Sequence, residues 1–206
     1  MCTMSLLKSQ QLKQLNNQAT QPNKVSGFTM VELLVTLVIV AILTIIAVPQ
    51  FTSATQTQRT SSEINNLLND VQFARSEALK EGQMVSLCIS STGTSCAGTG
   101  WHSGWIVYSA GATAGFVAGT SVVLRVQPAF TSTDTITTTP GSVTSLTFNR
   151  DGFNAGSGTT GLLFTLHTSA TNTAATRCLW VDALGRAYVQ KAGAALATNG
   201  QTTACS

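Results

Sequence analysis

A single carboxylate lies within the longest apolar run of the chain. Residues 28–48, FTMVELLVTLVIVAILTIIAV, contain no charged side chain except Glu32. A carboxylate in a bilayer costs several kcal/mol unless it is paired, so an acid in such a segment usually marks a functional site. Glu32 lies only four residues inside the run, and its side chain could instead reach headgroup water. A functional acid and a solvated one therefore both remain open.

Four cysteines after the apolar run form the second group with recognisable chemistry. Cys88, Cys96, Cys178 and Cys205 could form two disulfides in an oxidising compartment. Of the three possible pairings we favour Cys88 with Cys96, across a Gly/Ser/Thr loop, and Cys178 with Cys205. Zinc binding is the competing interpretation, but no pair has C-x2-C spacing and neither histidine lies near a helical pair position. Cys2 would remain unpaired.

Enzyme motifs are weak or absent. Residues 156–161 read GSGTTG, which satisfies G-x-G-x-x-G, but the strand-like LLFTL follows where a dinucleotide site needs the start of a helix. His102 and His167 have no cysteine or carboxylate constellation near them in the sequence. We therefore expect no enzyme activity, no cofactor and no metal. The tryptophans are expected to pack in the core or to anchor loops: Trp101, Trp105 and Trp180.

The positions of the charges predict a membrane topology. The 206 residues are 43% hydrophobic and 9% charged, which argues against disorder, and the formal net charge is +3. Lys8, Lys13 and Lys24 precede the apolar run and account for this excess, so the positive-inside bias places the amino terminus in the cytoplasm. A helix of 21 residues with a rise of ~1.5 Å per residue can span a bilayer. Everything after Pro49 then lies outside.

The segment KVSGFTMVELLVTLVIVAILTIIAVPQF, residues 24–51, resembles the amino-terminal motif of type IV prepilins and type II secretion pseudopilins. The resemblance implies that a prepilin peptidase cleaves after Gly27 and that Phe28 becomes the N-methylated first residue. It also implies that Glu32 neutralises the amine of a neighbouring subunit during assembly. The implied location is the bacterial inner membrane, with a single span and a periplasmic carboxy-terminal domain. The implied partners are other pilins or pseudopilins, the peptidase and inner-membrane lipid.

Helical and strand patterns follow the apolar run. Pro49 should kink the helix or interrupt it for a turn, and a second helical half is expected from about Thr52 to Glu81, stopped by Gly82. Its expected core face is the stripe of apolar residues at i, i+3, i+4 and i+7 spacing: Ile64, Leu67, Leu68, Val71, Ala74 and Ala78. Seven β-like runs follow: MVSLCIS, GWIVYS, SVVLRVQ, SLTFNR, GLLFTLHT, RCLWVDA and RAYVQK.

Hairpin turns are expected at Asp151-Gly152 and at Leu184-Gly185. The predicted fold is α+β and pilin-like, with a long kinked amino-terminal helix packed on one or two antiparallel β-sheets. Its membrane-spanning half would precede an amphipathic half. The expected organisation is a cleaved leader over residues 1–27, a transmembrane and assembly helix over 28–51, and a periplasmic globular domain over 52–206.

A finer resemblance rests on CISSTGTSCAGTGWHSGWIVY, residues 88–108, and on the carboxy-terminal Gly-Arg hairpin. Both are similar to the GspH/FimT branch, which implies a minor pilin or pseudopilin of a type II secretion pseudopilus or a type IV pilus. The similarity to FimT also suggests the alternative of a minor pilin that binds double-stranded DNA through Gly-Arg-x-Arg, for DNA uptake in natural transformation. Here that motif reads Gly185-Arg186-Ala187-Tyr188, and the tyrosine cannot neutralise a phosphate. The candidate DNA-binding residues are Arg177, Gly185, Arg186 and Lys191, with Arg150 as a further possibility.

Overall fold

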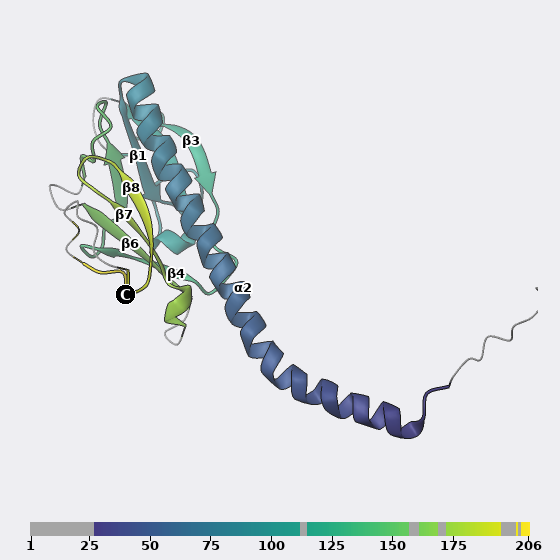
Figure 1. The fold of residues 1–206 in the computed structure, drawn as a ribbon. Coiled ribbons are helices and arrows are strands. Elements are labelled where there is room, and N and C mark those ends of the chain that lie inside the picture. Colours follow the sequence, from purple (N-terminus) through teal and green to yellow (C-terminus); the bar gives the residue numbers. More distant parts are fainter. Residues whose placement is uncertain (1–26, 112–114, 157–160, 169–171, 195–200, 202) are drawn as a thin grey trace, which may run out of the picture. The chain divides into compact units, whose positions relative to one another are not determined.

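The computed structural model has an α+β architecture, one long helix followed by eight strands in two antiparallel sheets (Figure 1). The structure describes residues 27–111, 115–156, 161–168, 172–194, 201 and 203–206. The elements are α2 (Met30–Glu81), β1 (Met84–Ile89), η2 (Trp101–Ser103), β2 (Trp105–Gly111), β3 (Val122–Gln127), β4 (Thr135–Thr139), β5 (Ser145–Phe148), β6 (Leu162–His167), η3 (Thr173–Ala175), β7 (Arg177–Val181) and β8 (Ala187–Lys191).

Helix α2 is continuous through Pro49, so the expected interruption at this proline is wrong. Loss of one backbone donor is not enough to end a helix whose flanking residues continue the pattern. The chain divides into two compact units between Ala47 and Val48, directly before the proline, and a kink at Pro49 stays a prediction. The helix ends where it was expected to end, because Gly82 follows with a φ of 64° and donates to the carbonyl of Ala78.

All seven expected strands are present, and the two sheets have the orders β3-β2-β1-β5 and β4-β6-β7-β8. Strand β4 was not anticipated, because its sequence TITTT has no apolar alternation. Its pairing with β6, in which Thr135 lies opposite His167 and Thr139 opposite Leu163, makes it a strand. Ile136 is its buried apolar side chain. Only tertiary context distinguishes such a segment from a loop.

The two predicted turns differ in outcome. The turn at Leu184-Gly185 joins β7 and β8 as a hairpin, as expected. The turn at Asp151-Gly152 reverses the chain only for a single bridge between Phe148 and Asn154. The chain then crosses to β6 in the other sheet, because β5 pairs with β1 whereas β6 pairs with β4 and β7. The predicted turn at Asp151-Gly152 is therefore present, since the N–H of Asn149 donates to the carbonyl of Phe153 and the N–H of Ala155 to the carbonyl of Thr147, but the described residues that follow it, as far as residue 156, form no strand of their own.

The core lies between the second half of α2 and the facing sides of both sheets. The predicted helical stripe is buried except for the partly buried Leu68, and it joins one cluster with Leu87, Trp105, Phe164 and Leu179. Trp101 and Trp105 belong to the same cluster, and Trp180 is buried in a smaller one beside Cys178 and Cys205. These contacts confirm core packing for the tryptophans. Removing this apolar surface from water is the main stabilising contribution to the domain.

Candidate assembly and binding sites

Thr29 forms the cap that starts α2 immediately after the expected cleavage point. Its hydroxyl accepts a hydrogen bond from the backbone N–H of Glu32 (3.2 Å), and its carbonyl accepts one from the N–H of Leu33 (3.2 Å). Thr29-x-x-Glu32 thus has the spacing of a capping box. Glu32 lies in the first turn of α2, where the positive end of the helix dipole favours a carboxylate. The cap therefore fixes the backbone of Glu32 in the first turn of the helix, four residues after Phe28.

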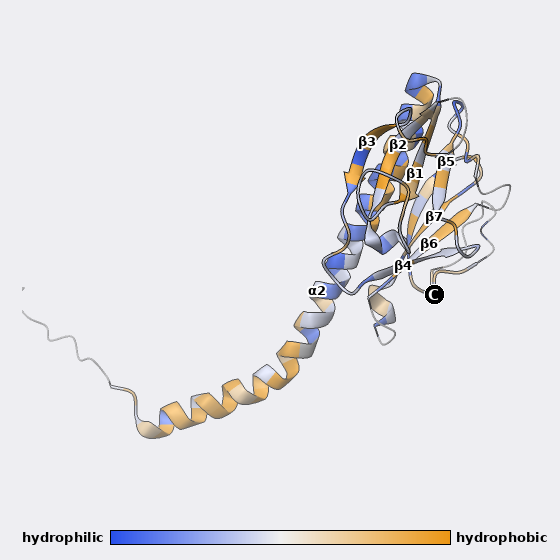
Figure 2. Cartoon of the chain, turned by 180° about the vertical axis from the view of Figure 1, so that it is seen from behind, coloured by the Kyte–Doolittle hydropathy of each residue, from blue (hydrophilic) through white to orange (hydrophobic). Residues whose placement is uncertain are grey.

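The first half of α2 presents an apolar surface on every side, and Figure 2 shows its hydropathy. Phe28 is 73% exposed, and the large apolar side chains that follow it as far as Phe51 are exposed as well. Among the described residues, α2 is the one helix long and apolar enough to cross a membrane. A helix that is apolar all round needs lipid or partner subunits to cover it. Glu32 is the single acid within this surface.

The cysteines form the favoured pairs, Cys88 with Cys96 and Cys178 with Cys205. The first disulfide closes the loop after β1, and the second ties the carboxy-terminal tail to β7. Because all four sulfurs are in disulfides, they are not zinc thiolates. Cys2 lies outside the described residues.

The candidate DNA-binding residues do not form one cluster. Arg177 is buried, and its guanidinium donates to the Ser61 hydroxyl and to the carbonyls of Ala174 and Thr176. This side chain serves the interior of the domain and is not available to a phosphate, which corrects its proposed role. Arg150 lines a separate hollow beside Gly82 and Asp151. Lys191 is exposed on β8.

Gly185 and Arg186 lie in a surface groove of about 570 Å³ between α2 and the β7–β8 hairpin. Arg186 donates from Nε to Asp182 Oδ2 (2.8 Å), and its backbone N–H donates to Asp182 Oδ1 (2.7 Å). Tyr188 lines the same groove with Gln72, Ser76 and Leu79. The motif arginine is therefore held in place by a neighbouring acid, which neutralises part of its charge.

Arg75 is the groove residue that sequence reasoning missed. It projects from α2, and its guanidinium donates to the carbonyls of Gly152 (3.0 Å) and Leu184 (3.2 Å). Arg75 thus bridges two turns and brings a second guanidinium to the groove of Arg186. In the sequence it is one polar residue on an amphipathic helix, and no spacing rule connects it to residue 186.

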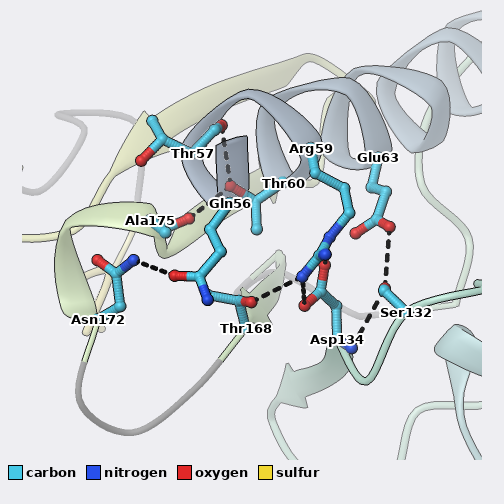
Figure 3. A network of polar contacts seen from close by, with 10 residues as sticks. All are labelled: Gln56, Thr57, Arg59, Thr60, Glu63, Ser132, Asp134, Thr168, Asn172 and Ala175. Carbon is cyan, nitrogen blue, oxygen red and sulfur yellow. Dashed lines mark hydrogen bonds and ion pairs between the residues drawn. The ribbon is translucent and has the colours of Figure 1, made fainter. Parts of the chain in front are cut away.

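A polar network joins the start of the globular domain to two loops (Figure 3). Arg59 on α2 donates to both carboxylate oxygens of Asp134 (2.7 Å each) and to the hydroxyl of Thr168 (3.0 Å). Ser132 donates to Glu63 Oε1 (3.2 Å). Thr60 Oγ1 donates to the carbonyl of Ala175 (2.7 Å), and Figure 3 shows the further bond between Asn172 and Gln56. None of these contacts is visible in the sequence.

The network contains two carboxyl groups whose pKa values shift in opposite directions. Burial, followed by the hydrogen bond and charge of Asp134, raises the pKa of Glu63 to about 7. Burial alone would raise the pKa of Asp134 as well, but the hydrogen bond from Arg59 and those from neighbouring groups outweigh burial and lower it. One carboxyl thus holds its proton near neutral pH while the other stays ionised.

Known protein families match both the amino-terminal helix and the globular part of the chain. The family described as "Type II transport protein GspH" matches residues 63–185, and the "Prokaryotic N-terminal methylation motif" matches residues 22–48. No curated protein shows significant similarity to the chain.

Two crystal structures of the type IV minor pilin FimU from Pseudomonas aeruginosa are similar at 25% identity. One covers 68% of this chain and 92% of FimU with a TM-score of 0.49, and the other covers 65% and 91% with a TM-score of 0.48. The GspH match alone spans more than half of the 206 residues. The chain therefore belongs to the GspH family, whose members are structural pilin-like subunits and not enzymes.

Proposed function

We propose that the chain is a minor subunit of a type II secretion pseudopilus or a type IV pilus, assembled through residues 28–51. The observation that carries the proposal is the order of features at the amino-terminal end of α2. Gly27 and Phe28 precede a Thr29 cap, Glu32 lies in the first turn, and an exposed apolar helix follows. The membership of the chain in the GspH family and its match to the methylation motif support the same role.

Cleavage after Gly27 would create a new α-amino group on Phe28, and N-methylation would keep that amine basic. An isolated carboxylate in an apolar layer is costly, and an isolated ammonium group is costly as well. Glu32 of one subunit pairing with the amine of a neighbour removes both costs at once. The pair can form only between subunits at matching depth, which would set the register of addition to the filament.

The proposed location is the inner membrane, with a single span and the globular domain in the periplasm. Lys8, Lys13 and Lys24 support a cytoplasmic leader, and the two disulfides suit an oxidising compartment. Prepilin peptidase and inner-membrane lipid are the partners before assembly. Other pilins or pseudopilins are the partners in the filament.

Glu32→Ala tests this mechanism in cells that assemble such a filament. We expect the variant to lose its leader as the unaltered chain does but to remain in the membrane fraction and be missing from sheared filaments. Glu81→Ala is the matched control, because Glu81 is an exposed acid at the far end of the same helix. Incorporation of Glu32→Ala at the control level would refute the role of Glu32.

Binding of double-stranded DNA is the second candidate function, and one observation favours it. Arg75 lines the groove of Arg186 and Tyr188, so the groove contains two arginines although the Gly-Arg-x-Arg motif here has only one. Two guanidinium groups and an aromatic ring can contact phosphates and stack on a base. Asp182 opposes this function, because it already pairs with Arg186.

A salt-titrated DNA-binding assay on the full chain in detergent tests this candidate. If the groove binds phosphates, affinity should fall steeply with salt, and Arg186→Ala should weaken binding and reduce the salt slope by about one. Lys80→Ala is the matched control, because it removes one exposed cation of α2 that does not line the groove. A flat salt response, or an equal loss in both variants, would exclude DNA binding at this groove.

A further inference from the structure

We propose that Arg59, Glu63 and Asp134 form a pH-sensitive latch, closed while Glu63 is protonated, that fastens the segment before β4 to α2. The device concerns the globular domain itself and does not depend on which filament the chain joins. Its parts come from segments far apart in the sequence, since Arg59 and Asp134 are 75 residues apart. Figure 3 shows how the three side chains converge.

Asp134 is the fixed centre of the latch. Its side chain has no exposed surface, and Arg59 holds both of its oxygens at 2.7 Å. Its backbone N–H donates to the hydroxyl of Ser132 (3.3 Å), and the same hydroxyl donates to Glu63 Oε1 (3.2 Å). One serine therefore links the backbone of Asp134 to the carboxyl group of Glu63.

The second oxygen of Glu63 explains why a proton is needed. Among the described residues, Glu63 Oε2 has no hydrogen-bond partner although it is buried. The hydrogen-bonding and charge effects of Asp134 raise the pKa of Glu63, because two carboxylates have no proton to share. A proton on Glu63 supplies the missing donor and leaves Arg59 balanced by one negative charge. Without it, two negative charges face one guanidinium.

Within the part of the chain that the structure describes, no further charged group acts on Glu63 to offset this imbalance. The charged groups that act on Glu63 are Arg59 from its own helix and Asp134 from the segment before β4. Two neutral hydroxyls also contact the pair: that of Ser132 donates to Glu63, and that of Thr168, directly after β6, accepts from Arg59. The raised pKa of Glu63, about 7, agrees with this geometry.

The direction of the pH effect follows from that shift. The folded state binds the Glu63 proton more tightly than the unfolded chain, so the stabilising effect is complete below the ordinary pKa of 4.5 and is lost as the pH rises through about 7. Above that range the two carboxylates repel each other across the latch. Strand β4 lies at the edge of its sheet, so its start can separate from α2 while β6, β7 and β8 stay paired.

Hydrogen exchange of the full chain in detergent tests the latch, with rates corrected for the intrinsic effect of pH. Peptides covering residues 128–140 should lose about tenfold in protection between pH 5.5 and 8.5, whereas peptides covering β1 and β2 should not. Glu63→Gln should keep the protection at pH 8.5, because the amide retains a donor. Glu81→Gln, the control on the same helix, should behave like the unaltered chain.

Two results would overturn the proposal. One is equal protection of residues 128–140 in the unaltered chain at both pH values, which decides the matter even if a variant fails to fold. The other is a pH-dependent loss in Glu63→Gln as large as that in the unaltered chain.

Discussion

Gly185 packs so closely against the carbonyl oxygen of Gly152 that a Cβ atom on Gly185 would overlap it. The same Cβ atom would lie 3.1 Å from Arg75 Nε and 3.2 Å from the ring of Phe148. The φ of Gly185 is +76°, a conformation that L side chains rarely adopt. The glycine of the Gly-Arg hairpin is therefore required for packing two turns against α2, whatever the groove binds.

Gly185→Ala should destabilise the domain by about 3 kcal/mol, because backbone strain and overpacking combine. Gly193→Ala is the matched control, since Gly193 has a φ of +74° and an added Cβ would meet nothing within 4 Å. The control should cost only about 1 kcal/mol from strain. Thermal unfolding of both variants measures the difference, and equal losses would contradict the packing argument.

Asp70→Ala should destabilise the domain by about 1–3 kcal/mol, because the buried N–H of Trp105 would lose its acceptor. Asp70 accepts from Trp105 Nε1 (2.9 Å) and from Arg125 (3.1 Å), whose guanidinium lies 3.7 Å from the centre of the Phe73 ring. Chemical denaturation followed by tryptophan fluorescence measures the loss. Glu81→Ala, an exposed acid on the same helix, should change the free energy of unfolding by less than about 0.5 kcal/mol. A loss no larger than that control would refute the role of Asp70.

Removing the second disulfide should cost more stability than removing the first. Cys178 and Cys205 are separated by 27 positions and Cys88 and Cys96 by 8, and the difference in loop closure alone is about 1 kcal/mol. Cys178 and Cys205 also pack in a buried cluster with Leu163 and Trp180. Unfolding of the two double cysteine-to-serine variants under oxidising conditions compares them directly. An equal or reversed order would contradict this account.

Local patterns predicted most of the architecture. The helical stripe, the stop at Gly82 and the alternating strands depend on residues close together in the sequence, so they can be recognised without the structure. Strand β4 was not predicted, because TITTT becomes a strand only through its pairing with β6. The crossing from β5 to the other sheet was not predicted for a similar reason. A turn signal in the sequence does not specify which strands pair with each other.

The candidate site was predictable only where it is contiguous in the chain. Gly27, Phe28 and Glu32 lie within six residues, so a local motif suggests them together, and their roles in cleavage and assembly stay predictions. Arg177 precedes a Cys and a hairpin and resembles an exposed cation. Two of its acceptors are carbonyls of the preceding residues, but the third is Ser61 on α2, and its burial depends on packing that the sequence does not show. The pairing of Arg59 with Asp134 across 75 residues was likewise invisible, because it depends on long-range packing.

The mass of the intact protein purified from cells with an active prepilin peptidase tests the central claim most directly. We predict a chain that begins at residue 28 and carries one added methyl group on Phe28. Gly27→Leu should block the cleavage and leave the leader attached, which shows that the peptidase and not another protease removes it. A chain of residues 1–206 that remains unprocessed beside an active peptidase would contradict assembly as a pilin-like subunit.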